Sequence, residues 1–571
     1  MHIHLHHHKL ANMFSIIVTP VMLLAQALVF PSIGYAQRAV PVNAHPASGM
    51  IVSTTRGHET DATTPEQCTA LTQIDFSRIE DAPTQITAAR LVETKGDPVY
   101  CQVQGYVSPQ VGFEIRLPVD NWNGKFMETG CAAACGTVMI NWLCPSLLRK
   151  GYACIASDMG HEAQIENGLW AYNNLDAQTD WGYRAAHVTA LAGKAITERF
   201  YKKSPDKSYF MGCSTGGREG LIEAQRFPWD FDGIIAGAPA SGQAAIIMTR
   251  LWAALAMRAS DGTPILSHAD LALVHNAVVA ACDMNDGVRD GLIGDPRTCN
   301  FDPQNLVCQG NSNTQCLSRQ QAQALKKIYG GPMTSRGQKI YADGGLMLGS
   351  ELAFSEYYQS GRFSSFDVDF LRYMAFMPAP GPNWQISDLN FDRDYKRFGM
   401  MESLYAASNP DLRAFEANGG KLILYQGWAD AGAGGVPPLK AVNYYETAEK
   451  TMGGPIATGD FFRLFMIPGM GHCGGGEGPD HIDYVSYLEN WVEHGQAPDV
   501  MVGAHIDTAR LARFLDTHDS KSPNFSREYE LFLNDPLSAK FTRPIYPYPL
   551  EARYKGTGDP NRADSFEAVH P

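Results

Sequence analysis

KSYFMGCSTGGREGL, residues 207–221, is the stretch of the chain that decides the fold. Residues 208–214 form a largely apolar run typical of a buried strand, and residues 219–227 (EGLIEAQRF) follow a helical pattern. Between them, Gly212-Cys213-Ser214-Thr215-Gly216 sets a serine between small residues, as a tight strand-to-helix turn requires. The stretch therefore predicts a strand, a sharp turn that exposes the serine, and a helix.

The same alternation of strand and helix extends on both sides of this turn. Apolar runs followed by turns and helical patterns lie at residues 152–158, 232–239, 421–427 and 462–469. Residues 183–200 place apolar side chains on one helical face. Strands that alternate with helices predict an α/β fold with a mainly parallel sheet.

The alternation breaks between about residues 240 and 415, where cysteines, an acidic loop and a Pro/aromatic-rich stretch replace it. We interpret residues 240–415 as a lid domain inserted into a core made of residues 37–239 and 416–571. The tail from residue 535, which is rich in Pro, Tyr and Gly, is expected to form an irregular strap over the core.

The N-terminus has the parts of a secretory signal. Histidines and Lys9 precede an apolar stretch at residues 14–30, and Gly34-Tyr35-Ala36 offers a small-x-small cleavage site. We predict that residues 1–36 are removed, leaving a secreted or periplasmic protein with no membrane attachment. An uncleaved anchor is the alternative, which the prolines in and beside the stretch disfavour.

The amino-acid composition of the chain limits the kinds of molecule that it is expected to bind. The 571-residue chain is 44% hydrophobic, enough for a sizeable core, and its net charge is −14. We find no basic stripe, so nucleic-acid binding is not expected. The oligomeric state stays open.

Ser214 needs a base and an acid, because a serine hydroxyl is a poor nucleophile at neutral pH. In the α/β-hydrolase order, the acid follows the serine and the histidine comes last. Asp430 and His472 each follow a predicted strand and fit this order. Asp158 also ends a strand but precedes the serine. The histidines that compete with His472 are His161, His187, His275 and His481.

A cysteine stands beside two of these residues. Cys213 precedes Ser214, and Cys473 follows His472. A disulfide requires Cα atoms within roughly 7 Å, so a Cys213–Cys473 bond would hold the serine and the histidine close together. The alternative is a pair of unrelated thiols.

With this arrangement, the chain resembles the secreted tannase and feruloyl esterase family, whose hallmark is Cys-Ser … Asp … His-Cys. Matching stretches include WNGKF (122–126), DWGYRAAH (180–187) and RPIYPYP (543–549). The chain also resembles the mono(2-hydroxyethyl) terephthalate hydrolase branch of that family. The resemblance implies an α/β-hydrolase core with a lid, and ester hydrolysis through an acyl-enzyme.

The resemblance also implies an oxyanion hole and further disulfides. Its first donor is the amide of Thr215, and the second lies in ETGCAAACG (128–136), at Gly130 or its neighbour Cys131. Three more disulfides are implied: Cys68–Cys101, Cys282–Cys299 and Cys308–Cys316. The remaining cysteines, whose pairing stays open, are Cys131, Cys135, Cys144 and Cys154.

The loop CDMNDGVRDGLI, residues 282–293, gathers carboxylates within the lid. Asp283, Asp286 and Asp290 offer the hard oxygen ligands that Ca²⁺ prefers, and the carbonyls of Val288 and Leu292 complete a set. Because the family has a structural calcium site in its lid, we expect structural Ca²⁺ here and no organic cofactor. A solvated acidic loop is the alternative.

These features together predict a secreted serine esterase that cleaves aromatic acid esters of the feruloyl or galloyl type. The alternative is a terephthalate monoester hydrolase, since Arg362 and Phe366 resemble a pair that clamps a carboxylate and covers a ring in that branch. Ala433, however, stands where the branch carries an aromatic residue. Two more functions stay open, namely a non-catalytic calcium-stabilised binding module and acyl transfer to another alcohol.

Overall fold

The computed structural model describes residues 64–570 apart from residues 96, 310–314, 359–362, 432–433, 520–521 and 523. The predicted signal peptide lies outside the described residues, and so does Arg362. No helix in the described part of the chain is both long and apolar enough to cross a bilayer.

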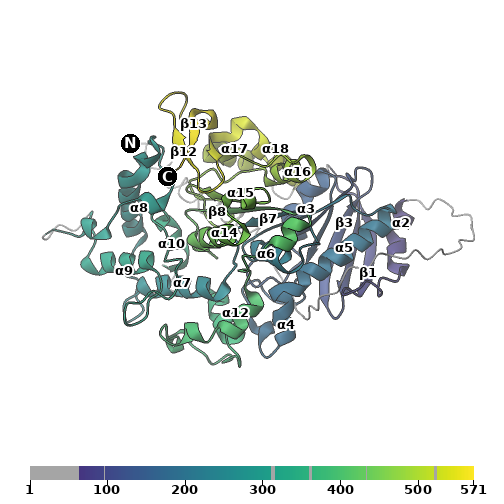
Figure 1. The fold of residues 1–571 in the computed structure, drawn as a ribbon, viewed down its shortest axis with the longest axis horizontal. Coiled ribbons are helices and arrows are strands. Elements are labelled where there is room, and N and C mark those ends of the chain that lie inside the picture. Colours follow the sequence, from purple (N-terminus) through teal and green to yellow (C-terminus); the bar gives the residue numbers. More distant parts are fainter. Residues whose placement is uncertain are drawn as a thin grey trace, which may run out of the picture.

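A large twisted sheet forms the centre of the molecule (Figure 1). Its order is β1-β2-β3-β5-β4-β6-β7-β8-β9, with β1 to β3 and the β3–β5 pair antiparallel and the other pairs parallel. The strands are Thr84–Val92, Tyr100–Val107, Val111–Pro118, Lys125–Thr129, Ala153–Ser157, Lys207–Cys213, Gly233–Gly237, Lys421–Gly427 and Phe462–Ile467. The predicted α/β class with a mainly parallel sheet is confirmed.

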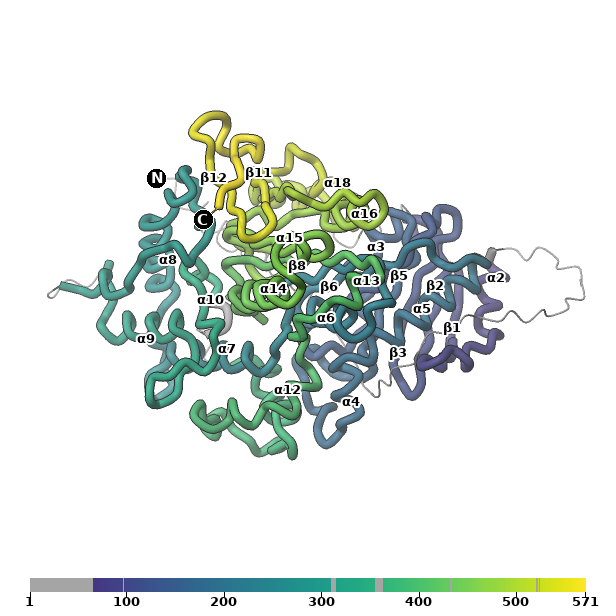
Figure 2. The backbone as a smooth tube through the Cα atoms, viewed as in Figure 1, coloured from purple at the N-terminus to yellow at the C-terminus, as the bar shows by residue number. Residues whose placement is uncertain are grey.

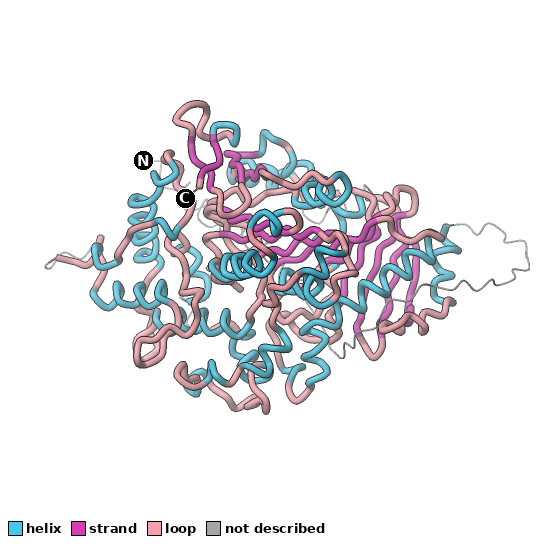
Figure 3. Tube along the Cα trace, viewed as in Figure 1, coloured by secondary structure: helices cyan, strands magenta, loops and turns pink. Residues whose placement is uncertain are grey.

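Helices cover both faces of this sheet (Figure 3). Phe210 and Ile234 share one hydrophobic cluster with α5 and α6, whereas their neighbours Tyr209 and Ile235 share the other with α3 and α16. Because successive strand residues point to opposite faces, the continuous apolar runs in the sequence reflect burial on both sides. The flanking helices are α2 (Thr64–Ala70), α3 (Ile140–Arg149), α4 (Leu175–Thr179), α5 (Ala185–Tyr201), α6 (Thr215–Arg226), α14 (Leu439–Met452), α15 (Pro455–Gly459) and α16 (Tyr484–His494).

The lid segment, residues 240–415, lies between β7 and β8 in the chain, although these two strands pair directly in the sheet. It is helical and has a hydrophobic cluster of its own that includes Leu271, Leu325 and Phe354. In Figure 2, α8, α9 and α10 lie to the left of β8, α7 and α12 lie below it, and α13 lies over the middle of the molecule beside α15. They are α7 (Gln243–Ala256), α8 (His268–Cys282), α9 (Arg319–Gly330), α10 (Glu351–Tyr358), α11 (Ser365–Asp369), α12 (Gly399–Tyr405) and α13 (Arg413–Ala417).

The C-terminal tail is more regular than the sequence suggested. β11 (Ala539–Ile545) pairs with β10 (Met501–Ile506), and β12 (Glu551–Tyr554) pairs with β13 (Phe566–Val569). The expected irregular strap is therefore wrong, because Ile545 and Met501 bury side chains in the core beneath the paired strands. Two further helices, α17 (Thr508–Thr517) and α18 (Phe525–Asn534), precede this tail.

Candidate active site

Ser214 occupies the sharp turn between β6 and α6, as the sequence predicts. Its φ of 63° and ψ of −118° lie outside the regions that ordinary residues prefer, which is typical of a nucleophile held at a strained elbow. The turn also explains Gly212, since a Cβ there would lie 2.5 Å from the carbonyl of Gly216. The local sequence thus folds so that the serine projects from the end of the strand.

Asp430 and His472 form a hydrogen-bonded pair in the loops after β8 and β9. His472 Nδ1 lies 2.9 Å from Asp430 Oδ2. The Asp430 side chain is fully buried and also accepts hydrogen bonds from the Val436 amide at 2.9 Å and from Gln426 Nε2 at 2.7 Å. These donors fix the carboxylate, which in turn orients the imidazole.

A disulfide joins this pair to the elbow. Cys213 and Cys473 are bonded, with their Cα atoms 5.9 Å apart, so the residue before Ser214 is linked to the residue after His472. This link brings together loops that are 260 residues apart in the chain. The disulfide therefore places the loop that carries His472, and with it the Asp430–His472 pair, next to the Ser214 elbow.

The other cysteines are also paired, with two exceptions. The structure contains the three disulfides that the family resemblance implied, Cys68–Cys101, Cys282–Cys299 and Cys308–Cys316. Of the cysteines left open, Cys131 bonds to Cys135. Among the described residues, Cys144 and Cys154 carry free thiols, and both are buried.

The backbone amides predicted as oxyanion donors have different surroundings. Thr215 is the first residue of α6, so its amide has no acceptor within the helix and is open to an oxyanion. The Gly130 amide, however, donates to the Met211 carbonyl at 3.0 Å and is not available. The alternative second donor, the Cys131 amide, lies 3.3 Å from Glu219 Oε2.

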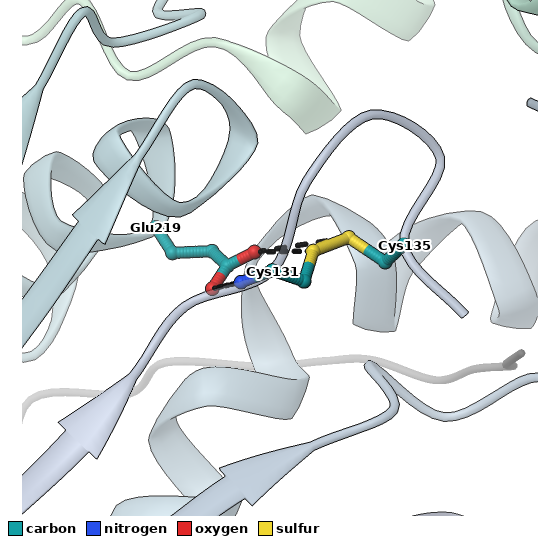
Figure 4. Close-up of side chains that lie close together, drawn as sticks. All are labelled: Cys131, Cys135 and Glu219. Atoms are coloured by element: carbon teal, nitrogen blue, oxygen red, sulfur yellow. Dashed lines mark hydrogen bonds between the residues drawn. A yellow bond between two sulfur atoms is a disulfide. The ribbon is translucent and has the colours of Figure 1, made fainter. Parts of the chain in front are cut away.

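Glu219 is a residue that the sequence reasoning missed. Its buried carboxylate, in the first turns of α6, meets the Cys131–Cys135 disulfide and the Cys131 amide (Figure 4). Burial raises the pKa of Glu219 to about 7, although Arg218 and the Cys131 amide oppose this. Glu219 thus holds the loop that contains Cys131 and Cys135 against α6, the helix that follows Ser214.

The residues that were alternatives to Asp430 and His472 in the sequence lie in other surroundings. Asp158 accepts the Gly160 amide at 2.6 Å, and burial raises its pKa well above the usual range. The competing histidines each have a neighbour of their own: His161 stacks on Trp170, His187 lies 2.5 Å from Asp230, His275 contacts Glu351 and Glu477, and His481 lies 3.3 Å from Asn534. His187 and Asp230 form a pair like that of His472 and Asp430, but among these histidines only His472 stands beside a cysteine that a disulfide links to the residue before Ser214.

Three carboxylates of the acidic loop in the lid segment lie near one another, although among the described residues they do not form a group whose oxygens all lie within 4.8 Å of one another. Burial, with the Asp290 and Asp283 carboxylates nearby, raises the pKa of Asp286 to about 7. Asp283 Oδ1 accepts the amides of Asp290 and Gly291, and Asp290 Oδ2 pairs with Arg543 at 2.5 Å. Within the described residues, no hydrogen bond reaches the Val288 or Leu292 carbonyl, so two oxygen donors remain for a cation. The hard oxygen donors of the loop suit Ca²⁺.

Two other groups of potential metal-ligating side chains lie closer together than the carboxylates of the acidic loop. Among the described residues, Cys131, Cys135 and Glu219 form one group whose ligand atoms lie within 4.8 Å of one another. His187, Glu223 and Asp230 form the other. The sulfurs of the first group are tied in a disulfide and so offer no thiolate to a metal.

Phe366, a predicted substrate residue, is almost fully buried in the lid segment. Its ring lies 6.4 Å from that of Trp181 and 6.3 Å from that of Phe370. The side chain therefore belongs to an aromatic cluster that joins the lid segment to the core.

Comparison with known proteins agrees with this geometry. The sequence profile described as tannase and feruloyl esterase matches residues 95–569. The chain is 33% identical to the mono(2-hydroxyethyl) terephthalate hydrolase of Piscinibacter sakaiensis, over 88% of this chain and 89% of the relative. It is also 33% identical to a probable feruloyl esterase of Arthroderma benhamiae, over 81% and 83% respectively.

A solved structure gives the same result. The crystal structure of feruloyl esterase B from Aspergillus oryzae matches 89% of this chain and 100% of its own, with a TM-score of 0.75 and 26% identity. Sequence, fold and site geometry agree, and the chain belongs to the tannase and feruloyl esterase family of carboxylic ester hydrolases.

Proposed function

We propose that the protein hydrolyses esters of aromatic carboxylic acids of the feruloyl or galloyl type. The observation that carries the proposal is the Asp430–His472 pair, which a disulfide joins to the strained Ser214 elbow. Relatives named as feruloyl esterases support the aromatic acyl group.

In the proposed mechanism, Ser214 attacks the ester carbonyl while His472 takes the serine proton. Asp430 holds the imidazole in the required tautomer and stabilises the imidazolium. The Thr215 amide, with the Cys131 amide once it turns from Glu219, stabilises the negative oxygen of the tetrahedral intermediate. His472 then protonates the departing alcohol. In the second half of the reaction, His472 takes a proton from water, which attacks the acyl-enzyme and releases the acid and Ser214.

Hydrolysis of methyl ferulate and methyl gallate tests the proposal. We expect the purified protein to cleave both, and Ser214→Ala to lose at least about 10³-fold in kcat. Equal rates for the two proteins would remove Ser214 from the mechanism. No cleavage by either protein would favour a non-catalytic binding module. Added acceptor alcohols distinguish hydrolysis from acyl transfer, because transfer yields a new ester.

Terephthalate monoesters are the second candidate substrates. The relative from Piscinibacter sakaiensis carries that activity in its name, and Phe366 lies in the aromatic cluster at the base of the lid segment. The proposal assigns Arg362 to the free carboxylate of such a substrate. For this candidate we expect kcat/KM to be higher for mono(2-hydroxyethyl) terephthalate than for methyl ferulate. The substitution Arg362→Gln should abolish this preference.

Two further properties complete the proposal. Asp283, Asp286 and Asp290, with the carbonyls of Val288 and Leu292, bind a structural Ca²⁺ that holds the lid segment to the tail through Arg543. The protein also acts outside the cytoplasm, since the disulfides between its loops form in oxidising compartments. Mass analysis of the exported protein tests cleavage after Ala36.

A further inference from the structure

The peptide between Gly130 and Cys131 carries the amide that serves as second oxyanion donor in the proposed mechanism. In the structure this amide lies 3.3 Å from Glu219 Oε2. On one side of the peptide, the Gly130 amide donates to the Met211 carbonyl at 3.0 Å. On the other side, the Cys131 carbonyl accepts the Gly216 amide at 2.9 Å. Because Gly130 has no Cβ, the peptide is able to rotate between these two fixed points, and its amide reaches an oxyanion only after it leaves Glu219.

The second oxygen of the Glu219 carboxyl, Oε1, faces sulfur. It lies 3.0 Å from Cys131 Sγ and 3.8 Å from Cys135 Sγ (Figure 4). Because these sulfurs are bonded to each other, they carry no hydrogen to donate and are only weak acceptors. A buried carboxylate needs hydrogen-bond donors for both of its oxygens, whereas a protonated carboxyl directs its own hydrogen from Oε1 toward the sulfurs. The Cys131–Cys135 disulfide therefore favours the protonated form of Glu219.

The ionisable groups around Glu219 do not supply the missing donor. The neighbouring Arg218 is buried too, but its guanidinium donates to backbone carbonyls. Burial raises the pKa of Glu128, on β4, well above its usual range, and lowers the pKa of His161, which interacts with the Ala134 backbone, well below its own, so both are uncharged. Burial also raises the pKa of Glu219 to about 7, although Arg218 opposes this. Glu219 therefore changes its ionisation near neutral pH.

We propose that Glu219 is a positioning residue for the second oxyanion donor: its protonated carboxyl releases the Cys131 amide to the oxyanion, and its ionised carboxylate withdraws that amide. The ionised form binds the amide through a charge-assisted hydrogen bond and adds a negative charge beside the oxyanion site. Both effects raise the energy of the tetrahedral intermediate. This inference rests on the proposed ester hydrolysis and specifies how pH regulates it.

The pH dependence of kcat tests the proposal with methyl 3,4-dimethoxycinnamate, an aromatic ester whose ring carries no ionisable hydroxyl. Removing one oxyanion donor costs about 10²–10³ in kcat, so the kcat of the wild type should fall at least about tenfold from pH 7 to pH 9 with little change in KM. Glu219→Gln keeps the shape of the side chain but cannot ionise, so its kcat should not fall over this range. The matched control is Glu223→Gln, which should retain the fall. It removes another buried carboxyl of α6, one that makes no hydrogen bond to the loop that contains Cys131 and Cys135 among the described residues.

Two double variants test the role of the sulfurs, and they do so even if Glu219→Gln does not fold. Cys131→Ser/Cys135→Ser replaces the disulfide with two hydroxyls that are able to donate to Glu219 Oε1. These donors stabilise the carboxylate, so the fall in kcat should move about one pH unit lower. The control is Cys131→Ala/Cys135→Ala, which removes the same disulfide without adding a donor, and its fall should stay at the pH of the wild type.

Three outcomes would overturn the role of Glu219 and leave the proposed esterase standing. The first is a wild-type kcat that stays constant from pH 7 to pH 9, and the second is a fall in kcat that Glu219→Gln retains. The third is a fall at the same pH in the serine and alanine double variants. No hydrolysis by the wild type at any pH would overturn both the role of Glu219 and the proposed function.

Discussion

At the scale of single residues, Asp430 is the group whose role the geometry defines most closely. Its buried carboxylate has His472 as one of three hydrogen-bonding partners. In Asp430→Asn the side chain keeps its shape but loses the charge that stabilises the imidazolium. We expect kcat for methyl ferulate to fall about 10³–10⁴-fold with little change in KM. Asp158→Asn, at the competing acid, is the control, and a larger loss there would reassign the acid.

The proposed triad could be predicted from the sequence because each member lies in the turn or loop after a strand, in a fixed chain order. The oxyanion donor could not be predicted in the same way. Parallel pairing sets Thr129 opposite Met211, and the next amide, that of Gly130, then continues the ladder. The register between β4 and β6 is set by the tertiary structure. No local motif therefore showed that the Gly130 amide already donates a hydrogen bond to the Met211 carbonyl. Glu219 was missed for the same reason, because its contacts lie 84 and 88 residues away along the chain.

At the scale of secondary-structure elements, the parallel strands β5 to β9 were evident because burial on both faces makes them largely apolar. The parallel strand β4 was not evident, because Lys125, Glu128 and Thr129 interrupt its apolar residues. The antiparallel strands β1 and β2 have mixed faces, and β1 in particular alternates buried and exposed residues at its start. The C-terminal strands were hidden because β12 and β13 are only four residues long and lie in a tail rich in prolines and glycines. Whether such segments form strands depends more on the strands they pair with than on their own amino-acid composition.

The Cys213–Cys473 disulfide joins two such elements, the β6–α6 elbow and the loop after β9. The double variant Cys213→Ala/Cys473→Ala should lose about 3–5 kcal/mol of unfolding free energy, because the bond closes a long loop. Its kcat should fall at least about tenfold, because Ser214 and His472 are no longer held together. The control is Cys308→Ala/Cys316→Ala, which opens a loop of the lid segment with a sequence separation of 8. An unchanged kcat in the first variant would contradict the bracing role.

The acidic loop of the lid segment offers a prediction at the same scale. Chelation should lower Tm by about 5 °C, because the crowded carboxylates repel one another once Ca²⁺ is removed. Asp286→Asn should have a lower Tm with Ca²⁺ present and little further change on chelation. Asp261→Asn, an exposed acid elsewhere in the lid segment, should respond to chelation as the wild type does. A Tm that changes with neither Ca²⁺ nor chelator would favour a solvated loop without a bound ion.

At the scale of the whole molecule, His275 joins the lid segment to the core. It lies on α8 between Glu351, also in the lid segment, and Glu477, in the loop that follows the catalytic histidine. Burial favours the neutral imidazole, but the hydrogen bonds that it donates to both carboxylates outweigh burial and raise the pKa of His275 to about 9. The charged imidazole therefore holds the two parts together at neutral pH.

This arrangement predicts how stability depends on pH. A folded-state pKa above the unfolded value of about 6.5 gives a stabilising contribution that is complete below pH 6.5 and is lost as the pH rises through 9. Glu477, whose pKa is lowered by His275, stays ionised across this range. We expect the free energy of unfolding of the wild type to exceed that of His275→Gln by about 2 kcal/mol at pH 6 and by much less at pH 10. Urea unfolding at pH 6, 8 and 10 measures the difference, with His494→Gln, at an exposed position on α16, as the control. A difference that stays constant from pH 6 to pH 10 would mean that His275 packs between the lid segment and the core without carrying the charge that joins them.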